Sequence, residues 1–162
     1  MTPDMFEGVD PDAQAAIRAY CGWHVAPSIT ETIVLDGPGS DVLMLPSLRV
    51  TDVARVTSGG TEIKDPEWSR AGMVRGSFDD RFGSVEVEFT HGFPADDVVI
   101  SVIKLAATRL AQGAALSMAG GNVRIGGIAV TVGQTGTSTY ADSTGDAYVD
   151  KVLAPYRLNL RP

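Results

Sequence analysis

A long segment after Pro94 carries few polar side chains, and it constrains the fold more than any other feature of the sequence. Asp96 and Asp97 suit the first turn of a helix, because carboxylates favour the positive end of the helix dipole. We predict a long buried helix that runs to about Leu116. Its polar residues fall near one line of the helix surface: Ser101, Lys104, Thr108 and Gln112. Because one sheet face covers roughly one side of a helix, this helix needs a second packing partner, either the first helix or a neighbouring subunit.

The same segment is not expected to cross a membrane. Its uninterrupted apolar runs, 98–100 and 102–103, are far shorter than the roughly 20 residues that a bilayer requires. No secretory signal is visible in residues 1–7. Tight binding of nucleic acid is not expected, because the chain has 13 Lys and Arg against 20 Asp and Glu, which gives a net charge of −7. The composition therefore favours a globular protein without a membrane segment.

The whole chain predicts an α+β fold in a single domain, because 162 residues are one ordinary domain's worth of sequence. Residues 1–9 are expected to be a flexible lead-in. A short N-terminal helix is predicted at roughly 11–21. Asp10 suits its N-cap, Pro11 its first position and Gly22 its end.

Between Trp23 and Phe93, short apolar runs alternate with turn residues, which indicates a small antiparallel β-sheet or barrel with one solvated face. The valines at 50, 53 and 56 are spaced by three, and this spacing predicts either a bulge or two different environments along the strand. A turn at 58–60 predicts a hairpin. The predicted strands are 29–35, 42–45, 49–57, 61–63, 71–75 and 84–90.

The C-terminal part begins with a predicted β segment, in which Ile128, Val130 and Val132 alternate with other residues. Residues 133–145 are Gly, Ser and Thr-rich and are expected to form a flexible loop, followed by a short helix at 146–153. The tail 154–162 is expected to be extended, because Pro155 disfavours helix continuation. It carries Tyr156, Arg157, Leu158, Leu160 and Arg161.

Two interpretations of this tail remain open. It either folds back on its own domain or docks on another protein, and Tyr and Arg are the side chains that often dominate interfaces.

Few residues point to catalysis or to a bound metal or cofactor. Cys21 is the single cysteine, so it forms no internal disulfide and fits a reducing compartment. A nucleophilic site built on Cys21, His24 and an aspartate is possible by composition, although a buried cysteine and a loop histidine are the simpler interpretation. His91 suits a turn at a strand end. The remaining acidic and glycine pairs are better explained as helix caps and turns than as metal or phosphate sites: 79–80, 96–97, 120–121 and 126–127.

The sequence resembles the head-to-tail adaptor (connector) proteins of long-tailed bacteriophages, notably those that infect actinobacteria. The resemblance rests on the order and spacing of short motifs over most of the chain, with the insert at 133–145 less typical. The motifs are Ile17-Arg-Ala-Tyr-Cys-Gly-Trp-His-Val-Ala-Pro27, Thr32-Ile-Val-Leu-Asp-Gly-Pro-Gly39, Val42-Leu-Met-Leu-Pro46, Val53-Ala-Arg-Val-Thr-Ser-Gly-Gly60, Val85-Glu-Val-Glu-Phe-Thr-His-Gly-Phe-Pro94, the helix 98–110, Ile125-Gly-Gly-Ile-Ala-Val-Thr131 and Leu153-Ala-Pro-Tyr-Arg157.

The resemblance implies a structural, non-enzymatic virion protein. Such adaptors form a homo-oligomeric ring, commonly a dodecamer, beneath the portal protein, and they connect the DNA-filled head to the tail and present a surface to the stopper, the next neck protein. It implies a location in the virion neck after assembly in the host cytoplasm. It also implies portal docking by Tyr156, Arg157, Leu158, Leu160 and Arg161. An acidic ring suits a channel through which DNA passes without specific binding, because carboxylates repel phosphates.

Two other functions stay open from the sequence. The first is a stopper or tail-completion protein of the same neck. The second is a small β-rich ligand-binding or enzymatic domain built around Cys21 and His24.

Overall fold

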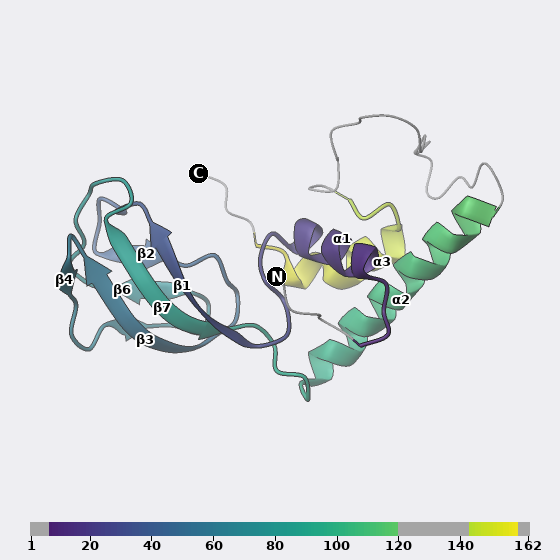
Figure 1. The fold of residues 1–162 in the computed structure, drawn as a ribbon, viewed down its shortest axis with the longest axis horizontal. Helices are drawn as coiled ribbons and strands as arrows, with labels where there is room; N and C mark the ends of the chain where they lie inside the picture. The colour runs from purple at the N-terminus through teal and green to yellow at the C-terminus, as the bar shows by residue number, and fades with distance from the viewer. Residues whose placement is uncertain (1–6, 120–142, 159–162) are drawn as a thin grey trace. The chain divides into compact units, whose positions relative to one another are not determined.

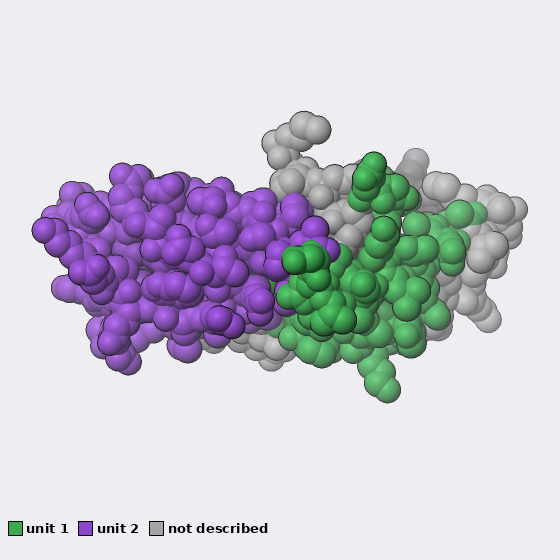
Figure 2. Space-filling view, turned by 90° about the horizontal axis from the view of Figure 1, so that it is seen from below, with its two compact units in different colours: residues 1–23, 96–162 green, residues 24–95 purple. Residues whose placement is uncertain are grey.

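The computed structural model describes residues 7–119 and 143–158, and it confirms the predicted α+β architecture of helices and small antiparallel sheets (Figure 1). The chain divides into two compact units (Figure 2). Unit 1 comprises residues 1–23 and 96–162, and unit 2 comprises residues 24–95. That residues 1–162 behave as a single domain stays a prediction.

Unit 2 contains two antiparallel sheets. The first has the strand order β1-β7-β3-β4, and the second has the order β2-β6-β5. Their bounds are β1 (Ile29–Leu35), β2 (Val42–Met44), β3 (Val50–Ser58), β4 (Thr61–Glu62), β5 (Glu67–Trp68), β6 (Met73–Arg75) and β7 (Val85–His91). β7 lies between β1 and β3, which are its hydrogen-bonded neighbours. The two-residue strand β5 was not predicted from the sequence.

The alternation in β7 sorts its side chains onto two faces. Val85, Val87 and Phe89 are fully buried, whereas Glu86 and Glu88 point to the other face, where Arg55 of β3 lies 3.5 Å and 3.8 Å from their carboxylates. The pairing of β3 with β7 shifts register at two places, between positions 50 and 52 and between 53 and 55. These shifts are irregularities of the kind that a bulge produces, and the bulge was one of the two alternatives that the valine spacing left open.

The core of unit 2 is a closed cluster of apolar side chains from both sheets. None of its buried members is more than 3% exposed, and partly buried side chains such as Ile33 and Phe78 pack around them. The buried members are Leu43, Leu45, Val50, Val56, Val74, Val85, Val87 and Phe89.

Unit 1 is helical. α1 (Pro11–Cys21) begins as predicted, because the Asp10 carboxylate accepts from the Asp12 backbone N–H, and it ends at Gly22 in the left-handed conformation. α2 (Val98–Ala119) contacts both α1 and α3 (Ala147–Leu153). α3 continues into a short 3-10 helix, η2 (Ala154–Tyr156), so the extended backbone predicted from residue 154 begins only at Arg157. Pro155 explains the difference, because proline is tolerated in the first turn of a helix.

Several predicted features fall partly or wholly outside the described residues. These are the β segment with Ile128, Val130 and Val132, residues 1–6 of the lead-in, 133–142 of the loop, and Leu160 and Arg161 of the tail.

Candidate interaction surfaces

The C-terminal segment contacts α1 through backbone and ring interactions within unit 1. The Tyr156 carbonyl accepts a hydrogen bond of 2.7 Å from the Trp23 indole, and the Leu158 N–H donates to the Cys21 carbonyl at 2.7 Å. The Arg157 guanidinium lies 5.1 Å above the centre of the Tyr20 ring. Three of the five predicted docking residues, Tyr156, Arg157 and Leu158, therefore lie together against the C-terminal end of α1.

Gly22 lies where the tail approaches the end of α1, and its backbone conformation favours glycine. Its left-handed φ of 77° ends α1, and a Cβ there would lie 3.5 Å from the Leu158 carbonyl oxygen. The hydrogen bond from Leu158 satisfies one of the last carbonyls of the helix, which otherwise have no partner inside it. The start of the tail thus folds back on its own unit, one of the two interpretations left open by the sequence.

A polar network fixes α3 beside α2. The Asp146 carboxylate caps α3 by accepting from the N–H groups of Tyr148 and Val149, and Arg109 of α2 donates to it at 2.6 Å. Burial alone raises the pKa of Asp146, but the hydrogen bonds from Arg109, Val149 and Tyr148 outweigh burial and hold that pKa below its ordinary value.

The last residues of the predicted flexible loop belong to the same network. Ser143 and Thr144 both bind the Asp150 carboxylate of α3, at 2.6 Å from each hydroxyl. The chain is therefore anchored from Ser143 onward.

α2 is buried on one side only. Ile103, Ala106 and Ala107 are almost completely buried, whereas Val98, Val102 and Leu105 are exposed, Val98 to 79% and Leu105 to 60%. Positions 98, 102 and 105 are spaced by four and three, so they form one stripe along the helix. We call these three residues the α2 stripe. The second packing partner that the sequence requires for this helix is thus not supplied along the α2 stripe by the described part of the chain.

α2 also bears on the sequence expectation that no segment crosses a membrane. Averaged over 18 residues, Val98–Ala115 has a mean hydropathy of 1.4, so it is long and apolar enough to cross a bilayer by length and composition alone. Counting only uninterrupted apolar runs missed this. Lys104 and Arg109 lie inside that window, and each charged residue near the centre of a span costs about 2.5–3.5 kcal/mol. The cost of these two charges and the contacts of α2 with α1 and α3 favour a helix that packs against protein over one that spans a bilayer.

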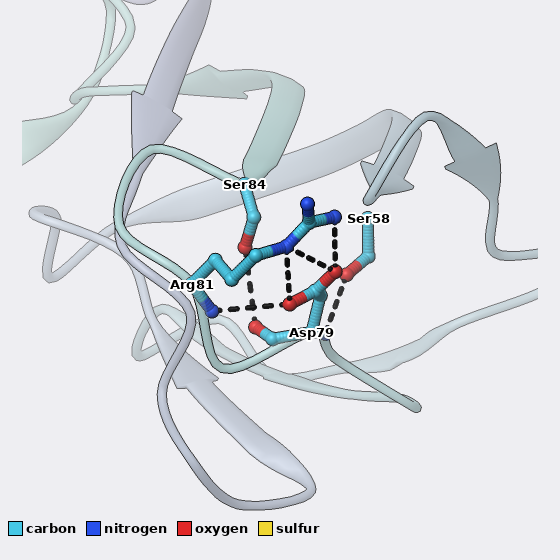
Figure 3. Close-up of polar contacts among 4 residues, drawn as sticks. All are labelled: Ser58, Asp79, Arg81 and Ser84. Atoms are coloured by element: carbon cyan, nitrogen blue, oxygen red, sulfur yellow. Dashed lines mark hydrogen bonds and ion pairs between the residues drawn. The ribbon is translucent and has the colours of Figure 1, made fainter.

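A second exposed apolar group lies at the loop of residues 79–84 in unit 2, whose polar contacts are drawn in Figure 3. Phe82 is 91% exposed, and Val34 of β1 is 61% exposed. A Cβ built on Gly83 would lie 3.9 Å from a Val34 methyl group, so Val34 borders this loop. A hollow of about 310 Å³ lies beside Phe82, lined also by Arg81 and the Gly59–Gly60 turn.

The backbone of this loop is held by its neighbours. Gly37 donates to the Arg81 carbonyl at 2.9 Å and Gly59 to the Ser84 carbonyl at 2.9 Å, while Gly83 donates to the Asp36 carboxylate at 2.8 Å. A Cβ on Gly37 would overlap the Asp79 carbonyl, so only glycine permits this approach.

Asp79 is held within the same loop, as Figure 3 shows. Its N–H donates to the Ser58 hydroxyl at 2.7 Å. The Arg81 guanidinium donates to both of its carboxylate oxygens. Hydrogen bonds from the guanidinium and the backbone N–H of Arg81 hold the pKa of Asp79 below its ordinary value. The pair 79–80, weighed from the sequence as a metal site, is thus one ion-paired carboxylate and one exposed carboxylate.

The two histidines of the sequence meet inside unit 2. The ring centres of His24 and His91 are 5.5 Å apart. His91 is 1% exposed, and its Nε2 lies 2.9 Å from a Glu31 carboxylate oxygen. Burial lowers the pKa of His91, Glu31 opposes that shift, and His24 adds to it. His91 is thus a buried side chain at the end of β7.

The alternative site at Cys21 lacks a reactive thiol. Cys21 is fully buried, and burial raises its pKa to about 12. Because the thiolate is the nucleophilic form, this cysteine is inert near neutral pH.

Asp97 caps α2 by accepting from the Val99 N–H at 3.0 Å, as helix electrostatics predicted for the pair 96–97. Residues 7–119 and 143–158 contain no group of three or more side chains placed to hold a metal ion.

The sequence reasoning missed the exposed loop at 79–84. The signal was local, because Phe82 stands among Asp79, Asp80, Arg81 and Gly83, an unusual place for a phenylalanine that packs in a core. The α2 stripe was anticipated only as part of a helix with more apolar surface than one neighbour covers.

No family model matches the sequence, and no curated protein matches it. Among solved structures, the fold is similar to that of a chain in the neck of a native GTA particle computed with C12 symmetry. The two chains share 17% sequence identity with a TM-score of 0.54, over 93% of this chain and 82% of that chain. At this identity the likeness shows a shared fold.

Proposed function

We propose that this protein is a structural subunit of the neck of a phage-like particle. The observation that carries the proposal is the shared fold with a chain of a GTA (phage-like gene transfer agent) particle neck over nearly the whole length. The motif resemblance to head-to-tail adaptors, noted from the sequence, points the same way. In the proposed role the chain forms a ring beneath the portal, connects head to tail and extends the DNA channel.

The α2 stripe supports the ring. Subunits of a ring meet through two different patches, so each subunit must present an unsatisfied surface to its neighbour. Val98, Val102 and Leu105 are exposed on a helix whose buried side packs against α1 and α3. Neck subunits that stack without lateral contact would have no need of such a stripe. The C12 symmetry of the similar neck is consistent with a ring of twelve copies.

The acidic charge supports a channel through which DNA slides. The net charge is −7, and carboxylates repel phosphates rather than hold them.

Portal docking by the C-terminal residues is part of the same proposal, with fewer residues in the contact than the sequence resemblance implies. Within unit 1, the backbone of Leu158 and the guanidinium of Arg157 already contact α1, and the backbone of Tyr156 contacts Trp23 just after it. We therefore assign portal contact mainly to Leu160 and Arg161, with Tyr156, Arg157 and Leu158 as the anchored base of the tail.

The test of location is an image of isolated neck complexes labelled with an antibody fragment against unit 2. We expect density for the label in a ring directly under the portal. Three results contradict the proposal. The label lies on the tail tube, it lies one component below the portal where a stopper would be, or it is absent from the particles.

The test of the tail removes residues 159–162 and keeps the contacts of 154–158 with α1. We expect a folded protein that no longer joins heads to tails, and the control Asn159→Ser, which keeps Leu160 and Arg161, should join them normally. Normal joining by the truncated chain contradicts the docking role and leaves the location intact.

A further inference from the structure

We propose that the α2 stripe of one subunit binds the loop 79–84 of a second copy of this chain. We call this loop the Phe82 loop. The inference rests on the proposed ring and names its two surfaces. Phe82 with Val34 forms one exposed apolar patch in unit 2, and Val98, Val102 and Leu105 form the other in unit 1. Because the two patches differ, a contact between them is heterologous. In each pair of subunits, one Phe82 patch and one α2 stripe stay available to bind further subunits.

The loop is suited to insertion because its conformation is already fixed. Hydrogen bonds from Gly37, Gly59 and Gly83 hold its backbone, and an ion pair joins the side chains of Asp79 and Arg81. A preorganised segment loses little conformational entropy when it binds. An aromatic side chain presented by a fixed backbone resembles the anchors that dominate interfaces.

The charges of the two surfaces are complementary. α2 carries Lys104 and Arg109 and no carboxylate along its length. The Phe82 loop carries Asp79 and Asp80 with Arg81, and Asp36 binds its backbone. Arg109 is occupied by Asp146, so Lys104 is the cation that a neighbouring Asp80 would meet. Opposite charges beside an apolar contact favour the correct pairing over a symmetric one.

A disulfide experiment tests the pairing directly. Cys21 is buried with a pKa of about 12, so introduced cysteines react without interference. We expect the double variant Phe82→Cys with Val102→Cys to form a ladder of covalent oligomers on oxidation at the highest soluble concentration. Each single variant should stop at dimers. The matched control, Trp68→Cys with Val102→Cys, places the first cysteine at another exposed aromatic residue of unit 2 and should give no ladder.

Three results overturn the pairing: an intramolecular disulfide in a monomer, no ladder, or an equal ladder from the Trp68 control. A second measurement uses sedimentation equilibrium. Phe82→Ser should weaken self-association by roughly thirtyfold or more, the size expected of an interface anchor, whereas Trp68→Ser should change it less than threefold.

The pairing and the ring can fail separately. If Leu105→Asp abolishes association and Phe82→Ser leaves it unchanged, the α2 stripe serves a ring through another surface and the pairing is wrong. If neck images show no ring of this chain, the proposed function is wrong whatever the cross-links show.

Discussion

The two compact units of this chain bury their apolar side chains to different extents. In unit 2 the core cluster is closed, and no buried member is more than 3% exposed. In unit 1 the longest helix packs one side against α1 and α3 and leaves the α2 stripe in solvent. Unit 2 therefore has a core that its own strands complete, whereas α2 still carries apolar surface that a partner can cover.

This difference separates stability from function along the sequence. Side chains in the unit 2 cluster hold the fold, and their loss opens cavities that the sheets cannot close. Side chains of the α2 stripe contribute little to the stability of the folded monomer. The hydrophobic contribution is proportional to the apolar area removed from water, and these side chains stay exposed. Substitutions in the two places should consequently change different measurements.

The largest expected effect is in the core of unit 2. Phe89→Ala removes a fully buried ring at the centre of β7 and should lower the free energy of unfolding by about 3–5 kcal/mol. Urea denaturation followed by circular dichroism measures the change. Val34→Ala on neighbouring β1 is the exposed control and should change stability by less than about 0.5 kcal/mol. A loss below about 1 kcal/mol for Phe89→Ala would mean that this core is not close-packed.

A matched pair on α2 tests the other half of the comparison. Ile103 is fully buried and Leu105 is 60% exposed. Ile103→Ala should cost about 2–5 kcal/mol of folding free energy, and Leu105→Ala should cost about 0.5 kcal/mol or less. Urea denaturation of the dilute monomer separates them. Equal losses would show that the α2 stripe is already covered within the chain.

The elements that the sequence predicted accurately depend on neighbouring residues. α1 was predicted at 11–21 because Asp10, Pro11 and Gly22 act within one turn of its ends, and β7 because its alternation is local. A bulge in β3 was one of the two alternatives that its three valines left open. Several boundaries moved by one residue. The larger shifts are at η2, which continues α3 through Pro155, at the end of α2, which reaches Ala119, and at β6, which begins at Met73 rather than near 71.

The sites were harder to predict than the elements, because their contacts join distant residues. Arg109 meets Asp146 across 37 residues, and Gly83 meets Asp36 across 47. No spacing rule connects such pairs. The anchoring of Tyr156 on Trp23 spans 133 residues, so the sequence left the direction of the tail open.

A smaller effect is expected where α2 holds α3. Asp146→Ala removes the N-cap of α3 and the partner of Arg109, and it should lower stability by about 1–2 kcal/mol. The control Asp10→Ala removes a cap without a bound arginine, and it should cost about 1 kcal/mol or less. Thermal unfolding ranks the two variants. A larger loss for Asp10→Ala would show that the Arg109 ion pair adds nothing to unit 1.

The smallest effect is a pH dependence confined to unit 2. Burial lowers the folded-state pKa of His91, whereas the unfolded chain has a histidine pKa of about 6.5. As the pH falls below about 6.5, the unfolded state takes up the proton first, so stability should decrease until the pH passes the lower folded-state pKa. Above that window the contribution of His91 is fully present.

Two variants isolate this contribution from other titrating groups. The difference in unfolding free energy between wild type and His91→Gln should vary with pH only below about 6.5. Glu31→Gln removes the carboxylate that opposes the shift, so NMR titration of His91 should show a still lower pKa. A His91 pKa at or above 6.5 in the wild-type protein would mean that Glu31 outweighs burial. In that case the sign reverses, and stability would be lost as the pH rises, because the folded state would then hold the proton more tightly than the unfolded chain.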